Sequence, residues 1–221
     1  TAFEGVRKLE PAHWLTWRNG EITTGRYWEL PYGPKLKISR EEACEAVREK
    51  LLEATRLRLM SEVPLGAFLS GGIDSSAVVA AMSRAGGGRV KTFSIGFEEK
   101  KFNELPYARM VAKAYGTEHE EFMVRPNALE VLPKLVRHYG EPYADSSAIP
   151  TYYLSQMTRR HVTVALNGDG GDESFTGYRR HYAMRMADFF YRFPGPLRKT
   201  GCSLLKLASP NAAERTSLMA G

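Results

Sequence analysis

The chain has 221 residues, of which 43% are hydrophobic and 25% charged, and this composition excludes a fibrous or wholly disordered protein. No apolar run approaches the ~18 residues needed to cross a bilayer, and only two cysteines, Cys44 and Cys202, are present, which excludes a disulfide scaffold and suits a reducing cytoplasm. Lys and Arg outnumber Asp and Glu by 31 to 25, and the resulting net charge of +6 leaves two interpretations open: a polyanionic partner such as RNA, or a soluble domain with a modest basic surplus.

The first predicted element is a β-hairpin. An Asn-Gly pair lies between two runs rich in aromatic and β-branched residues, 13–17 and 22–28, and this pattern is typical of a two-residue hairpin turn. An isolated hairpin is only marginally stable in water, so this segment needs another domain to pack on. A linker rich in Pro and Gly follows. We therefore divide the chain into a hairpin with its linker, residues 1–34, and a second domain, residues 35–221.

The rest of the chain alternates between predicted helices and strands. Ser39 lies three residues before Glu42, which predicts a capping box at the start of a helix, and Pro64 ends that helix. Cys44 falls within the helical pattern and is expected to be buried there rather than to act as a nucleophile. Short apolar runs predict strands, and amphipathic runs predict helices. The strands are expected at residues 65–69, 90–97, 119–124 and 162–166, and the later helices at 75–84, 104–115, 129–139, 149–160 and 179–192.

This alternation predicts an α/β domain, with a Rossmann-like, mainly parallel sheet flanked by helices. Ligands of such sheets bind beyond the carboxyl ends of the strands. Two Gly-rich loops, residues 70–76 and 167–173, each follow a predicted strand directly. We therefore expect both loops to lie at the ligand-binding edge of the sheet.

The first loop, Leu69-Ser70-Gly71-Gly72-Ile73-Asp74-Ser75-Ser76, has the composition of a phosphate-binding loop. Its glycines let backbone N–H groups turn toward a ligand, and the following helix adds the positive end of its dipole. The serine hydroxyls can donate hydrogen bonds to phosphate oxygens. A bare phosphate would repel Asp74, so this carboxylate indicates an intervening Mg²⁺. The alternative interpretation is a Gly-rich turn with no ligand.

The second loop is acidic and fits neither of two common nucleotide-binding motifs. The chain contains no G-x-x-x-x-G-K-[ST], and Glu173 stands where the dinucleotide fingerprint needs its last Gly. The loop, Asn167-Gly168-Asp169-Gly170-Gly171-Asp172-Glu173, places three carboxylates within five residues. Such a group suits metal coordination, binding of a substrate ammonium or acceptance of protons from an amine, unless it is a solvated acidic turn.

Together the two loops resemble the asparagine synthetase family. The first is similar to the S-G-G-x-D-S PP-loop of N-type ATP pyrophosphatases, and the second to the family signature S-G-[ED]-G-[SG]-D-E-x-F-x-G-Y. Residues 92–97 resemble the strand whose backbone holds adenine, and residues 103–108 match the family's N-E-x-x-Y-A. Residues 141–150 match E-P-[FY]-x-D-x-S-x-x-P, a pattern equally typical of a helix cap and turn. The resemblance covers nearly all of residues 3–185 and implies the adenine nucleotide α-hydrolase fold.

The resemblance also implies roles for individual residues. Asp169 takes the place of a family carboxylate linked to forming or using an acyl-adenylate, and Asp172 is expected to act with it. Asp74 and Asp172 are expected to hold Mg²⁺. The residues expected to bind ATP and its pyrophosphate are Leu69, Ser70, Gly71, Gly72, Asp74, Ser75, Ser76, Ile95, Asn167 and Gly168.

The implied reaction is that of a glutamine-hydrolysing asparagine synthase: aspartate, ATP and ammonia from glutamine give asparagine, AMP and pyrophosphate. The N-terminal glutaminase domain is missing except for its end, residues 1–34, and the family's late lysines have no counterpart in Lys199 or Lys206. We therefore expect a C-terminally incomplete fragment that is not fully active. No nucleic-acid or membrane partner is expected, and a homodimer is left open. The alternatives are a PP-loop tRNA-modifying enzyme, an amidotransferase for a sugar- or peptide-linked carboxylate, and a non-catalytic nucleotide-binding domain.

Overall fold

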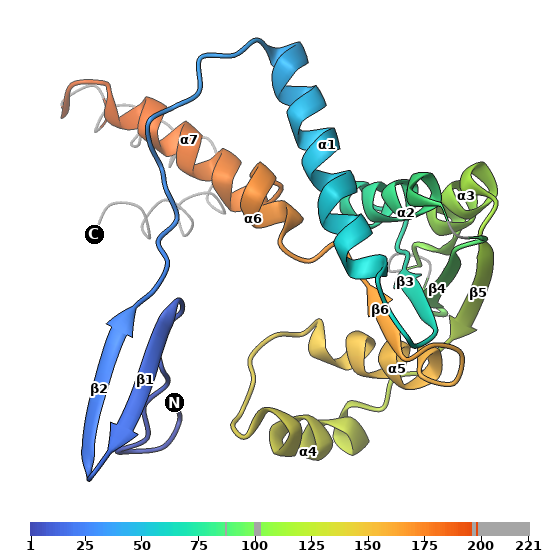
Figure 1. Ribbon diagram of the computed structural model, residues 1–221, viewed down its shortest axis with the longest axis horizontal. Helices are drawn as coiled ribbons and strands as arrows, with labels where there is room; N and C mark the ends of the chain where they lie inside the picture. Colours follow the sequence, from blue (N-terminus) through green and yellow to red (C-terminus); the bar gives the residue numbers. More distant parts are fainter. Residues whose placement is uncertain (87, 100–102, 196–197, 199–221) are drawn as a thin grey trace. The chain divides into compact units, whose positions relative to one another are not determined.

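The structure is a computed structural model that describes residues 1–86, 88–99, 103–195 and 198. It divides into two compact units, Thr1–Gly168 and Asp169–Gly221 (Figure 1). Lys199, Lys206 and Cys202, which the sequence singled out, lie outside the described residues. The predicted boundary after residue 34 stays a prediction.

The first unit begins with the predicted hairpin. Strands β1 (His13–Arg18) and β2 (Glu21–Arg26) pair antiparallel, with Arg18 opposite Glu21. Both turn residues have positive φ, 51° at Asn19 and 85° at Gly20, as a two-residue hairpin turn of the primed type requires. Most side chains of both strands are exposed, Trp17 among them at 69%. The hairpin prediction is therefore confirmed.

Helix α1 (Arg40–Leu59) begins as its capping box predicts. The Glu42 N–H donates to the Ser39 hydroxyl, and the Glu42 carboxylate accepts from the Ser39 N–H in return. Acidic residues in the first turn and basic residues in the last turn complement the helix dipole. Cys44 is exposed on this helix, so the expectation that it is buried was wrong. A helical position alone does not say which face meets the core.

The centre of the first unit is a four-stranded, wholly parallel sheet. Its strands are β3 (Leu65–Phe68), β4 (Lys91–Gly96), β5 (Glu118–Met123) and β6 (Val164–Leu166), in the order β5-β4-β3-β6. On β3, Ala67 pairs with Thr92 of β4 on one side and with Leu166 of β6 on the other. The predicted parallel α/β sheet is therefore confirmed.

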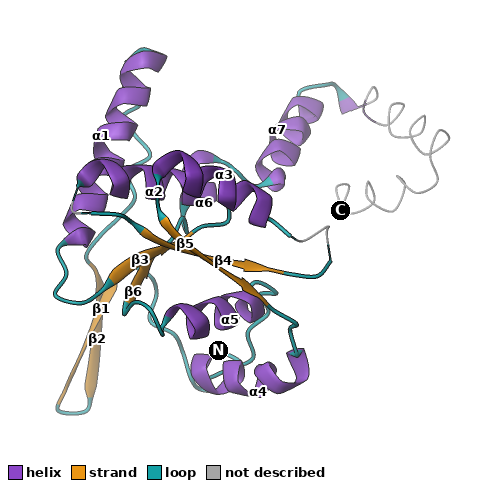
Figure 2. Ribbon diagram, turned by 90° about the vertical axis from the view of Figure 1, so that its right-hand side faces the viewer, coloured by secondary structure: helices purple, strands orange, loops and turns teal. Residues whose placement is uncertain are grey.

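Helices cover both faces of this sheet (Figure 2). Helices α2 (Ile73–Ala85) and α3 (Leu105–Tyr115) lie on one face, and α4 (Ala128–Tyr139) and α5 (Ala148–Thr158) on the other. Burial of an aliphatic side chain is worth about 1.5–3 kcal/mol, so two apolar clusters stabilise this arrangement. The first cluster is formed by Ala67, Leu69, Val79, Met82, Ala108 and Ala112, and the second by Val131, Leu135 and Ala148.

The second unit consists, in its described part, of α6 (Gly171–Phe175) and α7 (Arg179–Tyr191). The α7 bounds agree with the predicted helix. Helix α6 is a difference from the sequence analysis, because residues 171–173 were expected to belong to a loop. Among the described residues, no helix has both the length and the apolar character that a membrane span requires.

Candidate functional site

The order of the strands defines where a ligand can bind. From β3 the chain moves outward to β4 and β5, and then returns to place β6 on the opposite side of β3. The strand order thus reverses between β3 and β6, and in open parallel sheets the ligand crevice lies beyond the carboxyl ends at such a point. Residue 69 follows β3, and residues 167 and 168 follow β6. The first loop and the start of the second therefore flank the switch point.

Serine hydroxyls hold the first loop in shape. The hydroxyls of Ser70 and Ser75 lie 2.9 Å apart, within hydrogen-bond distance, and the Ser70 N–H donates to Ser75 Oγ over 3.3 Å. The Gly72 N–H donates to Ser70 Oγ over 3.2 Å. These bonds keep two hydroxyls side by side at the entrance to α2, where the sequence predicts a phosphate.

The amino end of α2 is open to a ligand. Its N-cap residue is Gly72, which has no side chain to accept from the first-turn N–H groups. Uncapped N–H groups and the positive end of the dipole form an anion site. A second observation supports a ligand: Ser76 Oγ is buried and has no hydrogen-bond partner among the described residues. A buried hydroxyl without a partner is unfavourable, and a bound oxyanion would satisfy it.

Two glycines let other segments approach this loop closely. Gly71 has a φ of 84°, and a Cβ built on it would lie 2.5 Å from the backbone of Tyr107 and Ala108, at the start of α3. A Cβ on Gly168 would lie 2.8 Å from the Ser75 nitrogen and from Cβ of Asp74. Gly168 therefore lies directly against the first turn of α2. Tyr107 and Ala108 belong to the motif at residues 103–108, but the motif does not indicate that they support the first loop.

Backbone and side-chain bonds to β4 anchor the start of the loop. The Leu69 N–H donates to the Phe93 carbonyl over 2.9 Å, and the Ser94 hydroxyl donates to the Leu69 carbonyl. Leu69 is 1% exposed. Ile95 is half-buried one residue further along β4. The roles predicted for Leu69 and Ile95 in binding ATP stay predictions.

Asp74 is a candidate Mg²⁺ ligand in the first unit. It lies in the first turn of α2, half-buried, and its carboxylate has no hydrogen bond or ion pair among the described residues. A carboxylate oxygen is the type of ligand that Mg²⁺ prefers, so the residue fits this ion. In the part of the chain that the structure describes, no three His, Cys, Asp or Glu side chains gather into a metal-binding group.

Asp169 and Asp172 belong to the second unit. Gly170, with a φ of 88°, precedes α6, and Asp172 lies in its first turn. The Asp172 carbonyl accepts from the Gly177 N–H over 3.0 Å. Glu173, the third carboxylate of the loop, accepts a 2.6 Å hydrogen bond from the Tyr178 hydroxyl. The Mg²⁺ site predicted for Asp74 together with Asp172, and the catalytic role of Asp169, stay predictions.

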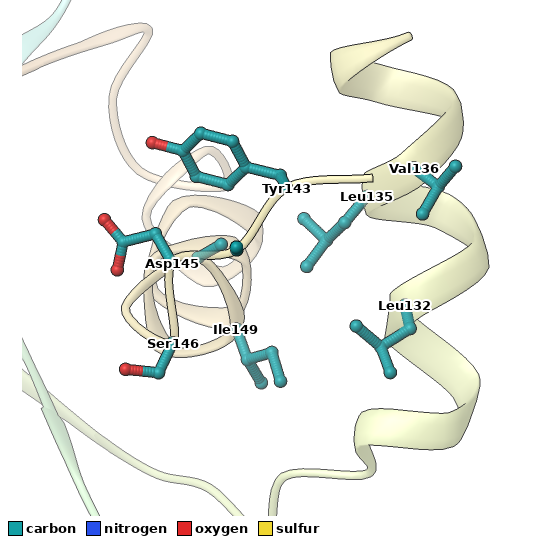
Figure 3. A pocket seen from close by; sticks show the side chains of 9 residues that line it. Leu132, Leu135, Val136, Tyr143, Asp145, Ser146 and Ile149 are labelled. Atoms are coloured by element: carbon teal, nitrogen blue, oxygen red, sulfur yellow. The ribbon is translucent and has the colours of Figure 1, made fainter. Parts of the chain in front are cut away.

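The segment before α5 has a structural role. Asp145 accepts from the N–H and the hydroxyl of Ser147, over 2.8 and 2.7 Å, in a turn that leads into the helix. These bonds hold the pKa of Asp145 below its ordinary value. A cavity of about 240 Å³ lies beside this turn, and Leu132 and Leu135 of α4 reach toward it, whereas the Asp145 carboxylate points away from α4 (Figure 3). The structure thus shows a turn before α5, whose N-cap residue Ser147 makes no side-chain capping bond, and the cavity is mainly apolar.

Comparisons with known proteins agree with the motifs. The family model described as asparagine synthase matches residues 46–220. A putative glutamine-hydrolyzing asparagine synthetase 2 from Methanocaldococcus jannaschii is 41% identical over 187 residues, 83% of this chain and 36% of that protein. The glutamine-hydrolyzing asparagine synthetase 1 of Bacillus subtilis is 37% identical over 196 residues, 88% of this chain and 31% of that protein. The chain thus spans about a third of the length of these relatives.

Among solved structures, a glutamine-dependent NAD⁺ synthetase from Acinetobacter baumannii, in complex with ADP, is similar over 72% of this chain and 32% of that chain. Its sequence identity is 19% and its TM-score is 0.45.

Proposed function

Because the chain belongs to the asparagine synthase family, we propose that it is the nucleotide-binding part of an enzyme that forms amides at the expense of ATP. The observation that carries this proposal is the first loop at the switch point of the sheet. It combines an uncapped helix, paired serine hydroxyls and a buried hydroxyl without a partner, which together suit a polyphosphate.

The proposed reaction has two steps. An oxygen of the acceptor carboxylate attacks the α-phosphorus of ATP, the bond to the β-phosphate oxygen breaks, and pyrophosphate leaves. Ammonia then attacks the acyl carbon of the adenylate and loses a proton, and AMP leaves with the bonding electrons. Charge accumulates on the departing pyrophosphate in the first step, and groups already aimed at that charge lower the barrier.

The residues of the first loop suit the first step. The N–H groups at the start of α2 and the hydroxyls of Ser70, Ser75 and Ser76 would bind the pyrophosphate oxygens. Gly168, without a side chain, lets the segment after β6 pack directly against the first turn of α2. Mg²⁺, when bound by Asp74 and Asp172, would supply positive charge against the phosphates.

The acceptor and the source of ammonia also belong to this proposal. Aspartate is the default acceptor, because the similar proteins are named asparagine synthetases. This chain matches only 31% and 36% of the length of the two relatives named as glutamine-hydrolyzing. We therefore place glutamine hydrolysis on a domain outside it, with the hairpin of residues 1–34 as the end of that domain.

Pyrophosphate release with ATP, ammonia and a panel of carboxylates tests the proposal in the intact protein. The variant pair Asp74→Ala with Asp169→Ala is expected to lose release, because it removes one carboxylate from each loop. Asp188→Ala is the control, since this exposed residue of α7 makes no hydrogen bond or ion pair within the described part of the chain. Release by the Asp74 and Asp169 pair at the parent's rate would refute the proposed function.

A further inference from the structure

We propose that Tyr178 is a positioning residue, whose hydroxyl holds Glu173 and thereby fixes the short turn that carries Asp172. This inference rests on the proposed function, because it assigns Asp172 a place in the site. Tyr178 is the last residue of the family signature quoted above, and the signature by itself gives it no role.

The central contact is a short, charge-assisted hydrogen bond. The Tyr178 hydroxyl donates to Glu173 Oε1 over 2.6 Å, within the range for an O–H donor and a carboxylate. The Glu173 carboxylate is therefore occupied by a neighbouring side chain. Asp172, the neighbouring carboxylate of the loop, lies in the same short helix as Glu173.

The Tyr178 ring is fixed by its own neighbours. The Arg180 guanidinium carbon lies 4.2 Å from the ring centroid, in cation–π contact, and the His181 ring meets it edge-on at 5.7 Å. These contacts restrict the ring, so that little side-chain freedom is lost when the hydroxyl bonds to Glu173. Tyr178 can therefore act as a rigid support.

The backbone explains why α6 needs such a support. The helix has five residues, too few to be stable alone. It ends at Thr176, with a φ of 58°, and the N–H groups of Thr176 and Gly177 both donate to the Asp172 carbonyl. A Cβ on Gly177 would lie 1.8 Å from the Asp172 carboxylate, so the chain folds back tightly around this side chain. The hydrogen bond from Tyr178 to Glu173 holds this turn closed, and a looser turn would misplace the Asp172 carboxylate.

Hydrogen exchange and kinetics on the intact protein test the inference together. In Tyr178→Phe, we expect hydrogen exchange at the Gly177 amide to be about tenfold faster than in the parent. We also expect kcat for pyrophosphate release to fall about tenfold, whereas KM for ATP and the melting temperature stay nearly unchanged. Tyr182→Phe is the matched control, because this tyrosine of α7 is 71% exposed and its hydroxyl makes no bond within the described residues.

Variants of Glu173 separate positioning from a general structural effect. Glu173→Ala should match the loss in kcat of Tyr178→Phe, and the double variant should be no slower than either single one. Glu173→Gln should recover most of kcat, because its amide oxygen still accepts from the hydroxyl. Unchanged exchange and kcat in Tyr178→Phe, or equal effects in Tyr182→Phe, would overturn the inference. If the parent releases no pyrophosphate with any carboxylate, the proposed function fails, and the exchange of Gly177 still decides whether Tyr178 holds the turn.

Discussion

Replacing Gly71 by alanine would test whether close backbone contact with α3 holds the first loop in its ligand-binding shape. The chain offers a matched control on the other end of the same helix. Gly71 precedes α2 with a φ of 84°, and Gly86 caps the carboxyl end of α2 with a φ of 83°. A Cβ on Gly86 would meet nothing within 4 Å, whereas on Gly71 it would lie 2.5 Å from two backbone atoms. The two substitutions therefore share a positive φ and differ in the steric overlap.

The two contributions can be separated in magnitude. A side chain at such a positive φ costs about 1–3 kcal/mol, and both variants should lose this amount in free energy of unfolding. In Gly71→Ala the new Cβ would stand about 0.9 Å short of the ordinary contact distance of 3.4 Å, and the opposing atoms are backbone, which cannot rotate away. Overpacking of this kind costs roughly a further 1–3 kcal/mol unless the loop moves away from α3.

Denaturant unfolding and ATP binding provide the assay. We expect Gly71→Ala to bind ATP at least about tenfold more weakly than the parent, because relief of the overlap displaces Ser70 and Gly72. Gly86→Ala should keep the parent's affinity while losing stability. Equal stabilities for the two variants, together with parental ATP affinity in Gly71→Ala, would show that contact with α3 does not shape the loop.

Three further substitutions follow from contacts in the first unit. Gly168→Ala should weaken ATP binding without changing the sheet, because its Cβ would lie 2.8 Å from the Ser75 nitrogen; parental affinity in a titration would contradict this. Asp145→Ala should lower the free energy of unfolding by about 1 kcal/mol, since the N–H and the hydroxyl of Ser147 lose their acceptor; an unchanged free energy in urea unfolding would contradict this. Burial lowers the pKa of His119 below its ordinary 6.5, so the unfolded chain binds the proton more readily and the free energy of unfolding should fall as the pH drops below 6.5. Urea unfolding at pH 7.5 and 5.5 measures this loss, which should be smaller in His119→Gln than in the parent. An equal loss in the two proteins would refute the role of His119.

Elements with strong local signals could be predicted from the sequence. The Asn-Gly turn at residues 19 and 20 and the capping box of Ser39 and Glu42 both formed as expected, because each signal acts within a few residues. Helix α2 begins at Ile73, two residues earlier than predicted, since its N-cap Gly72 has no capping side chain to mark the start. Helix α6 could not be predicted, because it has only five residues and begins at Gly171, within a Gly-rich segment.

The candidate site could be predicted only in part. The composition of the two loops pointed to the carboxyl edge of the sheet, where the structure places residues 69–76 and 167–168. The pairing of β6 beside β3 was not evident, because strand order depends on long-range packing that a single sequence does not encode locally. The support of Gly71 by α3 and of Glu173 by Tyr178 depends in the same way on tertiary contacts.

The contrast between the two helix starts has a thermodynamic consequence. Helix α1 carries its own cap in Ser39, whereas α2 begins with Gly72 and lacks one. A bound phosphate would serve as the missing cap, so binding and folding of this helix are linked equilibria. The apparent stability of the domain should then rise with the logarithm of the nucleotide concentration above its dissociation constant. The domain would then resist unfolding and proteolysis more strongly when nucleotide is abundant.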